Sequence, residues 1–236
     1  MFLPTRDHHI QLADAARMTR RFRETRLNDE KGGAFHAAQV KELLDQPDCS
    51  ALRYYHALEE DGRTTVVLVG VDARNDDLWD GVLLEVSIPC PPYCGLPNEL
   101  TASERPKGKQ PYRAVPLALP KRDHHITLDA AATMTRRYRE AFGDRVKGGA
   151  YLAPQVRELL AQRDCLALRY YYALEAAKET LILVGVDPEG ADLTDGVLLE
   201  TTIPCPPYCG VLNSLNASLG STKMRRLEVA VTAGSL

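Results

Sequence analysis

The sequence predicts an α+β protein made by tandem duplication of one unit, in which two helices are followed by three strands of a small antiparallel sheet. Three observations support this fold class. Long segments recur in the same order in the two halves, apolar residues change from a helical period to a period of two within each half, and both halves contain the turn Cys-Pro-Pro-Tyr-Cys-Gly. We expect the two copies to pack with pseudo-two-fold symmetry, as the subunits of a dimer do.

The repeat sets the expected domain boundaries. Residues 3–10 reappear as residues 119–126, and the turn at 90–95 reappears at 205–210. A chain of 236 residues, 44% hydrophobic and 26% charged, has room for two units of about a hundred residues, each with its own core. The predicted organisation is a first α+β repeat at 1–100, a linker rich in proline and basic residues at 101–117, a second repeat at 118–213, and a C-terminal tail at 214–236 that includes a short edge strand at 227–231.

Each unit is expected to begin with two helices. Apolar residues recur at helical spacing over residues 11–25, and the matching helix of the second copy is expected at 128–141 with Thr127 as its N-cap. The glycine pair at 32–33 then predicts a turn with positive φ. A second helix follows the glycines in both copies, and Pro154 falls in the first turn of the later one.

Three strands complete each unit. Side chains alternate over residues 52–59, so that Arg53 faces away from Leu52 and Tyr54. A hairpin turn follows, and the β-branched run at 65–71 is typical of a central strand that is buried on both faces. Residues 82–88 alternate again and predict the third strand, which leads into the cysteine turn.

Four short motifs carry a resemblance to known sequences. They are Gly-Gly-Ala-Phe at 32–35, Leu-Arg-Tyr-Tyr at 52–55, Leu-Val-Gly-Val-Asp at 68–72 and Cys-Pro-Pro-Tyr-Cys-Gly at 90–95. The chain resembles small uncharacterised bacterial proteins that carry one copy of this unit. The resemblance covers most of both halves and supports the domain boundaries, but it implies no activity, cofactor or site residue.

The cysteine pairs are the most reactive groups that the repeat preserves. Cys90 and Cys94 are separated by three residues, two of them proline, and Cys205 and Cys209 repeat this arrangement. Prolines restrict the turn and so reduce the entropy lost when the two thiols come together. A structural thiol pair or disulfide is the favoured interpretation, followed by a shared metal and then by redox catalysis, which normally has two intervening residues and a helix after the first cysteine.

The metal alternative requires further ligands. Three thiolates and an imidazole would satisfy a tetrahedral zinc ion. Zinc knuckles, however, usually have two residues between the paired cysteines, whereas this chain has three. For Cys49 and Cys165 we favour a buried apolar role over metal binding. The candidate zinc ligands are Cys90, Cys94, His8, His9, Cys205, Cys209, His124 and His125, with Cys49 and Cys165 as weaker candidates.

Charge, apolar run length and motif content narrow the classes of function that the sequence favours. A net charge of −3 produces no general attraction to nucleic acid, and the longest apolar run, residues 65–71, is far shorter than the ~20 residues of a membrane span. No serine nucleophile motif or dinucleotide fingerprint occurs in the sequence. We therefore predict a non-enzymatic binding or scaffold protein of the cytoplasm that binds a protein partner or a second copy of itself. A zinc-binding protein and a thiol-disulfide oxidoreductase are the alternatives.

Overall fold

The computed structural model describes residues 2–26, 30–101, 118–143, 146–200 and 202–217. Within these ranges the chain is an α+β protein with four α-helices and two antiparallel sheets of five strands each. No helix of the described ranges is long and apolar enough to cross a membrane. The predicted linker, apart from its first residue, and the predicted tail beyond residue 217, with its edge strand at 227–231, lie outside the described residues.

The four helices lie where the sequence predicts them. Thr127 caps the third helix as expected, because its hydroxyl accepts a hydrogen bond from the Ala130 backbone N–H, and Pro154 lies in the first turn of the fourth. The helices are α1 (Leu12–Thr25), α2 (Ala37–Leu44), α3 (Leu128–Phe142) and α4 (Ala153–Leu160).

Each sheet takes strands from both halves of the chain. The first sheet has the order β5 (Ile88–Cys90), β1 (Gly32–His36), β7 (Ala167–Glu175), β8 (Lys178–Val186), β9 (Leu198–Leu199). The second has the order β10 (Ile203–Cys205), β6 (Gly148–Leu152), β2 (Ala51–Leu58), β3 (Thr64–Val71), β4 (Leu83–Leu84). We call them the β7 sheet and the β2 sheet. Strand β1 of the first half pairs with β7 of the second, and β6 of the second half pairs with β2 of the first.

The glycine pairs form strands, so the predicted turn is wrong. Gly32 opposes Tyr171 across the β1–β7 ladder, and a Cβ atom at Gly32 would lie 2.0 Å from the Tyr170 carbonyl oxygen. Gly148 has the same relation to Tyr54, also at 2.0 Å. Glycine is therefore required because the neighbouring strand approaches closely, and not because the chain turns.

The third predicted strand, residues 82–88, is also divided in the structure. Its first part is β4 in the β2 sheet and its last residue begins β5 in the β7 sheet. Between them, Val86 has a φ of 57°, which an extended strand does not allow. The chain thus crosses from one sheet to the other in the middle of a continuous alternating pattern.

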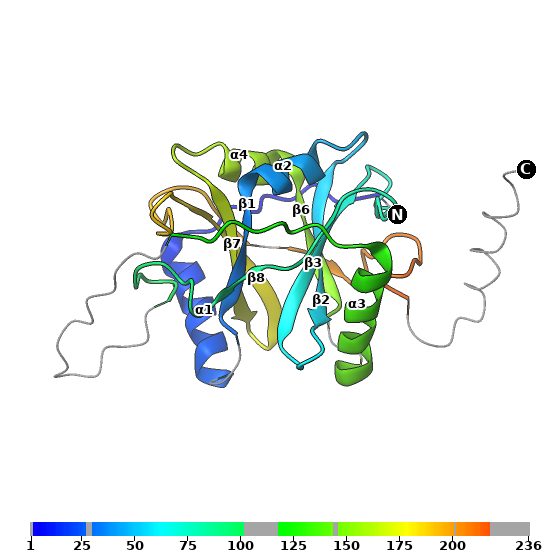
Figure 1. The fold of residues 1–236 in the computed structure, drawn as a ribbon, viewed down its shortest axis with the longest axis horizontal. Coiled ribbons are helices and arrows are strands. Elements are labelled where there is room, and N and C mark those ends of the chain that lie inside the picture. Colours follow the sequence, from blue (N-terminus) through cyan, green and yellow to red (C-terminus); the bar gives the residue numbers. More distant parts are fainter. Residues whose placement is uncertain (1, 27–29, 102–117, 144–145, 201, 218–236) are drawn as a thin grey trace, which may run out of the picture.

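The two sheets pack face to face with a shared core between them (Figure 1). Tyr54 and Leu68 enter this core from the β2 sheet, and Tyr170 and Leu183 enter it from the β7 sheet. Helix α1 covers the outer face of the β7 sheet, α3 covers the outer face of the β2 sheet, and α2 and α4 lie together at one end. The expectation that each copy has its own core is wrong, because the strands that complete each sheet come from the other half.

Candidate functional site

The two cysteine turns are disulfide loops. Cys90 is bonded to Cys94 and Cys205 to Cys209, with S–S distances of 2.02 and 2.04 Å. In each pair the first cysteine is fully buried and the second is partly exposed. The favoured interpretation included a disulfide in each pair, and both disulfides are present.

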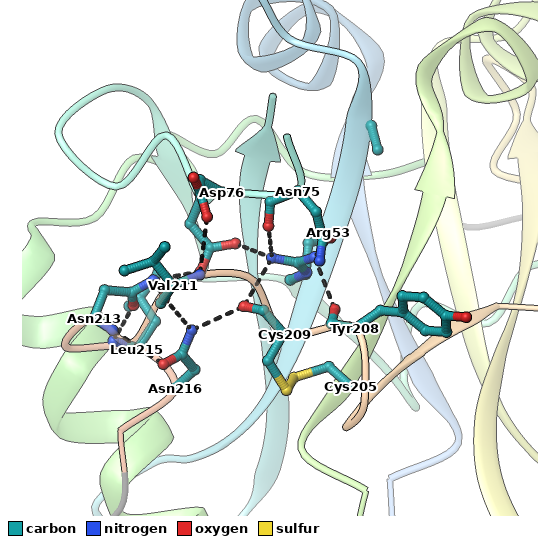
Figure 2. A network of polar contacts seen from close by, with 12 residues as sticks. Arg53, Asn75, Asp76, Cys205, Tyr208, Cys209, Val211, Asn213, Leu215 and Asn216 are labelled. Carbon is teal, nitrogen blue, oxygen red and sulfur yellow. Dashed lines mark hydrogen bonds and ion pairs between the residues drawn. A yellow bond between two sulfur atoms is a disulfide. The ribbon is translucent and has the colours of Figure 1, made fainter. Parts of the chain in front are cut away.

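A buried arginine of the first half holds the second-half loop (Figure 2). The Arg53 guanidinium donates hydrogen bonds to the Tyr208 carbonyl at 3.0 Å and to the Cys209 carbonyl at 3.3 Å. Arg53 is fully buried and forms an ion pair with Asp77, and it also donates to the Asn75 side chain. Because the loop and the arginine belong to different halves, this contact joins the two halves.

Neutral donors complete the surroundings of the Asp77 carboxylate. The Tyr55 hydroxyl donates to it at 2.8 Å and the Asn213 amide donates at 2.7 Å. Burial raises the pKa of Asp77 above its ordinary value, while the positive charge of Arg53 and these two donors act in the opposite direction. The Asp77 carboxylate thus connects the turn after β3 with strand β2, through Arg53 and Tyr55, and with the segment that follows the loop, through Asn213.

The same arrangement holds the first-half loop. Arg169 is fully buried, forms an ion pair with Asp192 and donates to the Tyr93 carbonyl at 2.9 Å. The Tyr171 hydroxyl and the Asn98 amide donate to Asp192 at 2.8 and 2.7 Å. Each disulfide loop is therefore fixed by an arginine from the opposite half.

Two of the four candidate histidine ligands are buried and bind backbone groups. The His8 ring contacts the Glu200 carbonyl at 3.2 Å through Nδ1, and its Nε2 accepts from the Leu152 N–H at 3.1 Å. His124 makes the equivalent contacts with Val86 and His36 at 2.9 and 3.0 Å. These contacts suit a neutral ring, and burial lowers the pKa of His124 to about 4.

The other two candidate histidines are partly exposed and bind carboxylates. His9 Nδ1 lies 2.6 Å from Asp7 and its Nε2 lies 3.1 Å from Glu158. The hydrogen bond that His9 donates to the Asp7 carboxylate raises the pKa of His9, and the bond to Asp123 does the same for His125. Residues 7–9 are thus tied to α4, a helix of the other half.

The structure does not bring the candidate zinc ligands together. Within the described ranges, no three His, Cys, Asp or Glu side chains form a group that could hold a metal ion. Cys49 and Cys165 are free thiols that each donate to a backbone carbonyl at 3.4 Å, and burial raises the pKa of both. Zinc binding therefore stays a prediction that concerns the chain with its disulfides reduced.

A groove lies beside the second-half disulfide loop, and the sequence analysis missed it. Its volume is about 380 Å³, and the side chains of Phe2 and Val211 in its lining are 74% and 66% exposed. Its walls come from three separated segments, which is why no single motif predicts it. The lining residues are Phe2, Arg74, Asn75, Asp76, Pro207, Gly210 and Val211.

Polar contacts and close backbone packing join two walls of this groove. Arg53 binds both Asn75 and the carbonyls of the 205–209 loop, and the Asp76 carboxylate accepts from the Val211 N–H at 2.9 Å. At Gly210, where φ is 69°, a Cβ atom would lie 2.0 Å from the Asn75 carbonyl oxygen. The turn 74–76 and the loop 205–209 are therefore joined by polar contacts on two sides of the groove.

The corresponding place in the first-half loop has different side chains. Leu96 follows Gly95 as Val211 follows Gly210, but the facing turn contains Glu189, Gly190 and Ala191 in place of Arg74, Asn75 and Asp76. The two loops thus share their internal contacts and differ at the surface that they present.

Comparison with protein-family models, curated proteins and solved structures finds no match to this chain.

Proposed function

We propose that the chain is a non-enzymatic binding protein that captures a protein segment in the groove between the turn 74–76 and the disulfide loop 205–209. The observation that carries this proposal is the groove itself, with the exposed apolar side chains of its lining. Exposed apolar residues gathered at one place on a folded protein commonly mark an interaction site.

The position of the reactive groups supports binding over catalysis. The paired cysteines are bonded to each other, and the first of each pair is fully buried. His8 and His124 bind backbone groups through both ring nitrogens. These cysteines and histidines are therefore engaged in contacts within the fold.

The lining indicates the chemistry of the partner segment. Phe2, Pro207 and Val211 offer apolar surface, whereas Arg74 and Asp76 place one positive and one negative charge at the same site. A peptide that inserts an apolar side chain and keeps its polar backbone near these charges fits both features. An apolar anchor in a preformed recess is also the usual centre of binding energy in such interfaces.

A peptide-display selection tests the proposal. A random dodecapeptide library is selected on the native chain, and the enriched peptides are measured by calorimetry on Val211→Glu and on the matched variant Leu96→Glu. We expect a loss of at least tenfold in affinity for Val211→Glu and little change for Leu96→Glu, because only the former changes the groove. Peptides that bind both variants as well as the native chain, or no enriched peptide at all, would refute the proposal.

We further propose that the chain arose by tandem duplication, with pseudo-two-fold packing of the copies. The support comes from pairs of equivalent contacts, such as Arg53 with Asp77 and Arg169 with Asp192. A duplication also explains why the two arginines make equivalent contacts with the two loops.

The cytoplasmic location stays a proposal, and the two disulfides are the observation that opposes it, because disulfides persist mainly in oxidising compartments. Fractionation of cells followed by alkylation of free thiols decides the question. Reduced cysteines in the cytosolic fraction support the proposal, whereas oxidised pairs in an exported fraction refute it.

A further inference from the structure

The two halves meet mainly along strand ladders. Strand β1 pairs with β7 from Gly32 opposite Tyr171 to His36 opposite Ala167, and β6 pairs with β2 over five residue pairs as well. These are the ladders that place β1 and β6 inside the five-stranded sheets. The contact between the halves therefore has a defined register and does not depend on side-chain packing alone.

The segments before α1 and α3 add to this contact. The Ile10 N–H donates to the Leu198 carbonyl at 3.1 Å, and the Glu200 N–H donates to the His8 carbonyl at 2.7 Å. Residues 124–126 bind Leu83 and Glu85 of the first half in the same way, at 3.0 and 2.8 Å. Each half thus places an extended segment beside an edge strand, β9 or β4, that belongs to the other half.

A single half does not make a closed structure. In the first half, α1, β1 and β5 lie on or in the β7 sheet, whereas β2, β3 and β4 lie in the β2 sheet. Without the second half, β1 would lose β7, β2 would lose β6, and the inner faces of both groups would be exposed. Each half therefore presents a large surface that only the complementary half fits.

We propose that the partner for this surface is the complementary half of a second copy of the chain, so that two molecules can exchange halves and form a dimer of two complete sandwiches. Every contact between halves described above is unchanged when the halves belong to different molecules. The covalent connection between the described halves passes through residues 102–117. Protein concentration then decides between the two forms. The half on the same chain is present at an effective concentration of the order of millimolar. Dilute protein therefore favours the monomer, and refolding at a higher concentration favours the dimer.

The test uses full-length chains of natural abundance and chains labelled with ¹⁵N, with a protease recognition sequence inserted between residues 108 and 109. The two preparations are mixed in urea with their disulfides intact and refolded at about 1 mM or at about 1 μM. Native mass spectrometry then measures the masses before and after cleavage at the inserted sequence.

Exchange predicts dimers at the high concentration and monomers at the low one. After cleavage, each dimer should separate into two sandwiches, and the mixed dimers should yield sandwiches that contain one light and one heavy half. Dimers that separate into entirely light and entirely heavy sandwiches would show ordinary surface association and overturn the proposal. Refolding to monomers alone at about 1 mM would overturn it as well.

Discussion

Two arginines in the middle of strands, Arg53 and Arg169, connect the halves. The alternation of residues 52–59 correctly separated Arg53 from Leu52 and Tyr54, but an arginine on the second face of a strand is normally exposed. Its burial depends on Asp77, which is distant in the sequence and lies in a loop with several other acidic residues. Local patterns do not identify which of those carboxylates turns inward.

Replacing Arg53 tests this contact. We expect Arg53→Ala to lower the free energy of unfolding by about 3–5 kcal/mol, because Asp77 would stay buried without its counter-ion. The double variant Arg53→Met, Asp77→Leu should cost less than the single change, since it removes both charges. Urea unfolding measures both values, and Arg63→Ala, at an exposed ion pair, serves as the control with an expected loss below about 1 kcal/mol. A loss for Arg53→Ala no larger than that of the control would contradict the role assigned to it.

Buried histidines make the fold sensitive to acid. Burial lowers the pKa of His56 and of His124 to about 4, against about 6.5 when unfolded. Between pH 4 and pH 6.5 the unfolded chain binds more protons than the folded chain. The contribution of these histidines to the free energy of unfolding is therefore fully present above pH 6.5 and is lost as the pH decreases toward 4. Each histidine contributes a loss on the order of 3 kcal/mol.

A variant of His56 separates the loss of stability caused by histidine protonation from that caused by the titration of carboxylates. His56→Tyr introduces the residue found at the matching position of the second half, Tyr172. Its free energy of unfolding should decrease less than that of the native chain between pH 7 and pH 4. Equal pH dependence of the two proteins, measured by urea unfolding, would show that His56 is not held neutral by burial.

The glycine pairs lie in strands, although paired glycines in the sequence predict a turn. Gly32 and Gly33 predict a turn because turns are the commonest use of paired glycines, whereas here they admit a neighbouring strand. We expect Gly32→Ala to destabilise the protein by about 1–3 kcal/mol or more, because the new Cβ meets a backbone carbonyl that cannot move alone. Thermal unfolding measures the change, and a neutral result would refute the β1–β7 register.

The disulfide loops are supported by both covalent and polar contacts. Replacing Cys205 and Cys209 by serine removes a closure of very short range, for which chain entropy predicts a loss of about 2 kcal/mol. Because this loop forms one wall of the groove, the same variant should also bind the selected peptides more weakly. Calorimetric titration checks this, with Cys90→Ser, Cys94→Ser as the matched control at the other loop. Equal weakening by both variants would contradict the assignment of binding to one groove.

Much of the architecture could be predicted from local patterns, but its assembly could not. Helix positions, the Thr127 cap and the pairing of neighbouring cysteines depend on local sequence and agree with the structure. The pairing of β1 with β7 depends on which of two similar partners a strand selects, because each half offers nearly the same sequence. Likewise, the groove is made by segments that only this pairing brings together.

Shared sheets and a shared core imply that neither half can unfold alone. Differential scanning calorimetry measures this directly on the native chain. A single transition is expected, with equal calorimetric and van't Hoff enthalpies, because loss of either half removes strands from both sheets. Two separate transitions, each with about half of the total enthalpy, would mean that the halves are independent domains and would contradict the exchanged arrangement of strands.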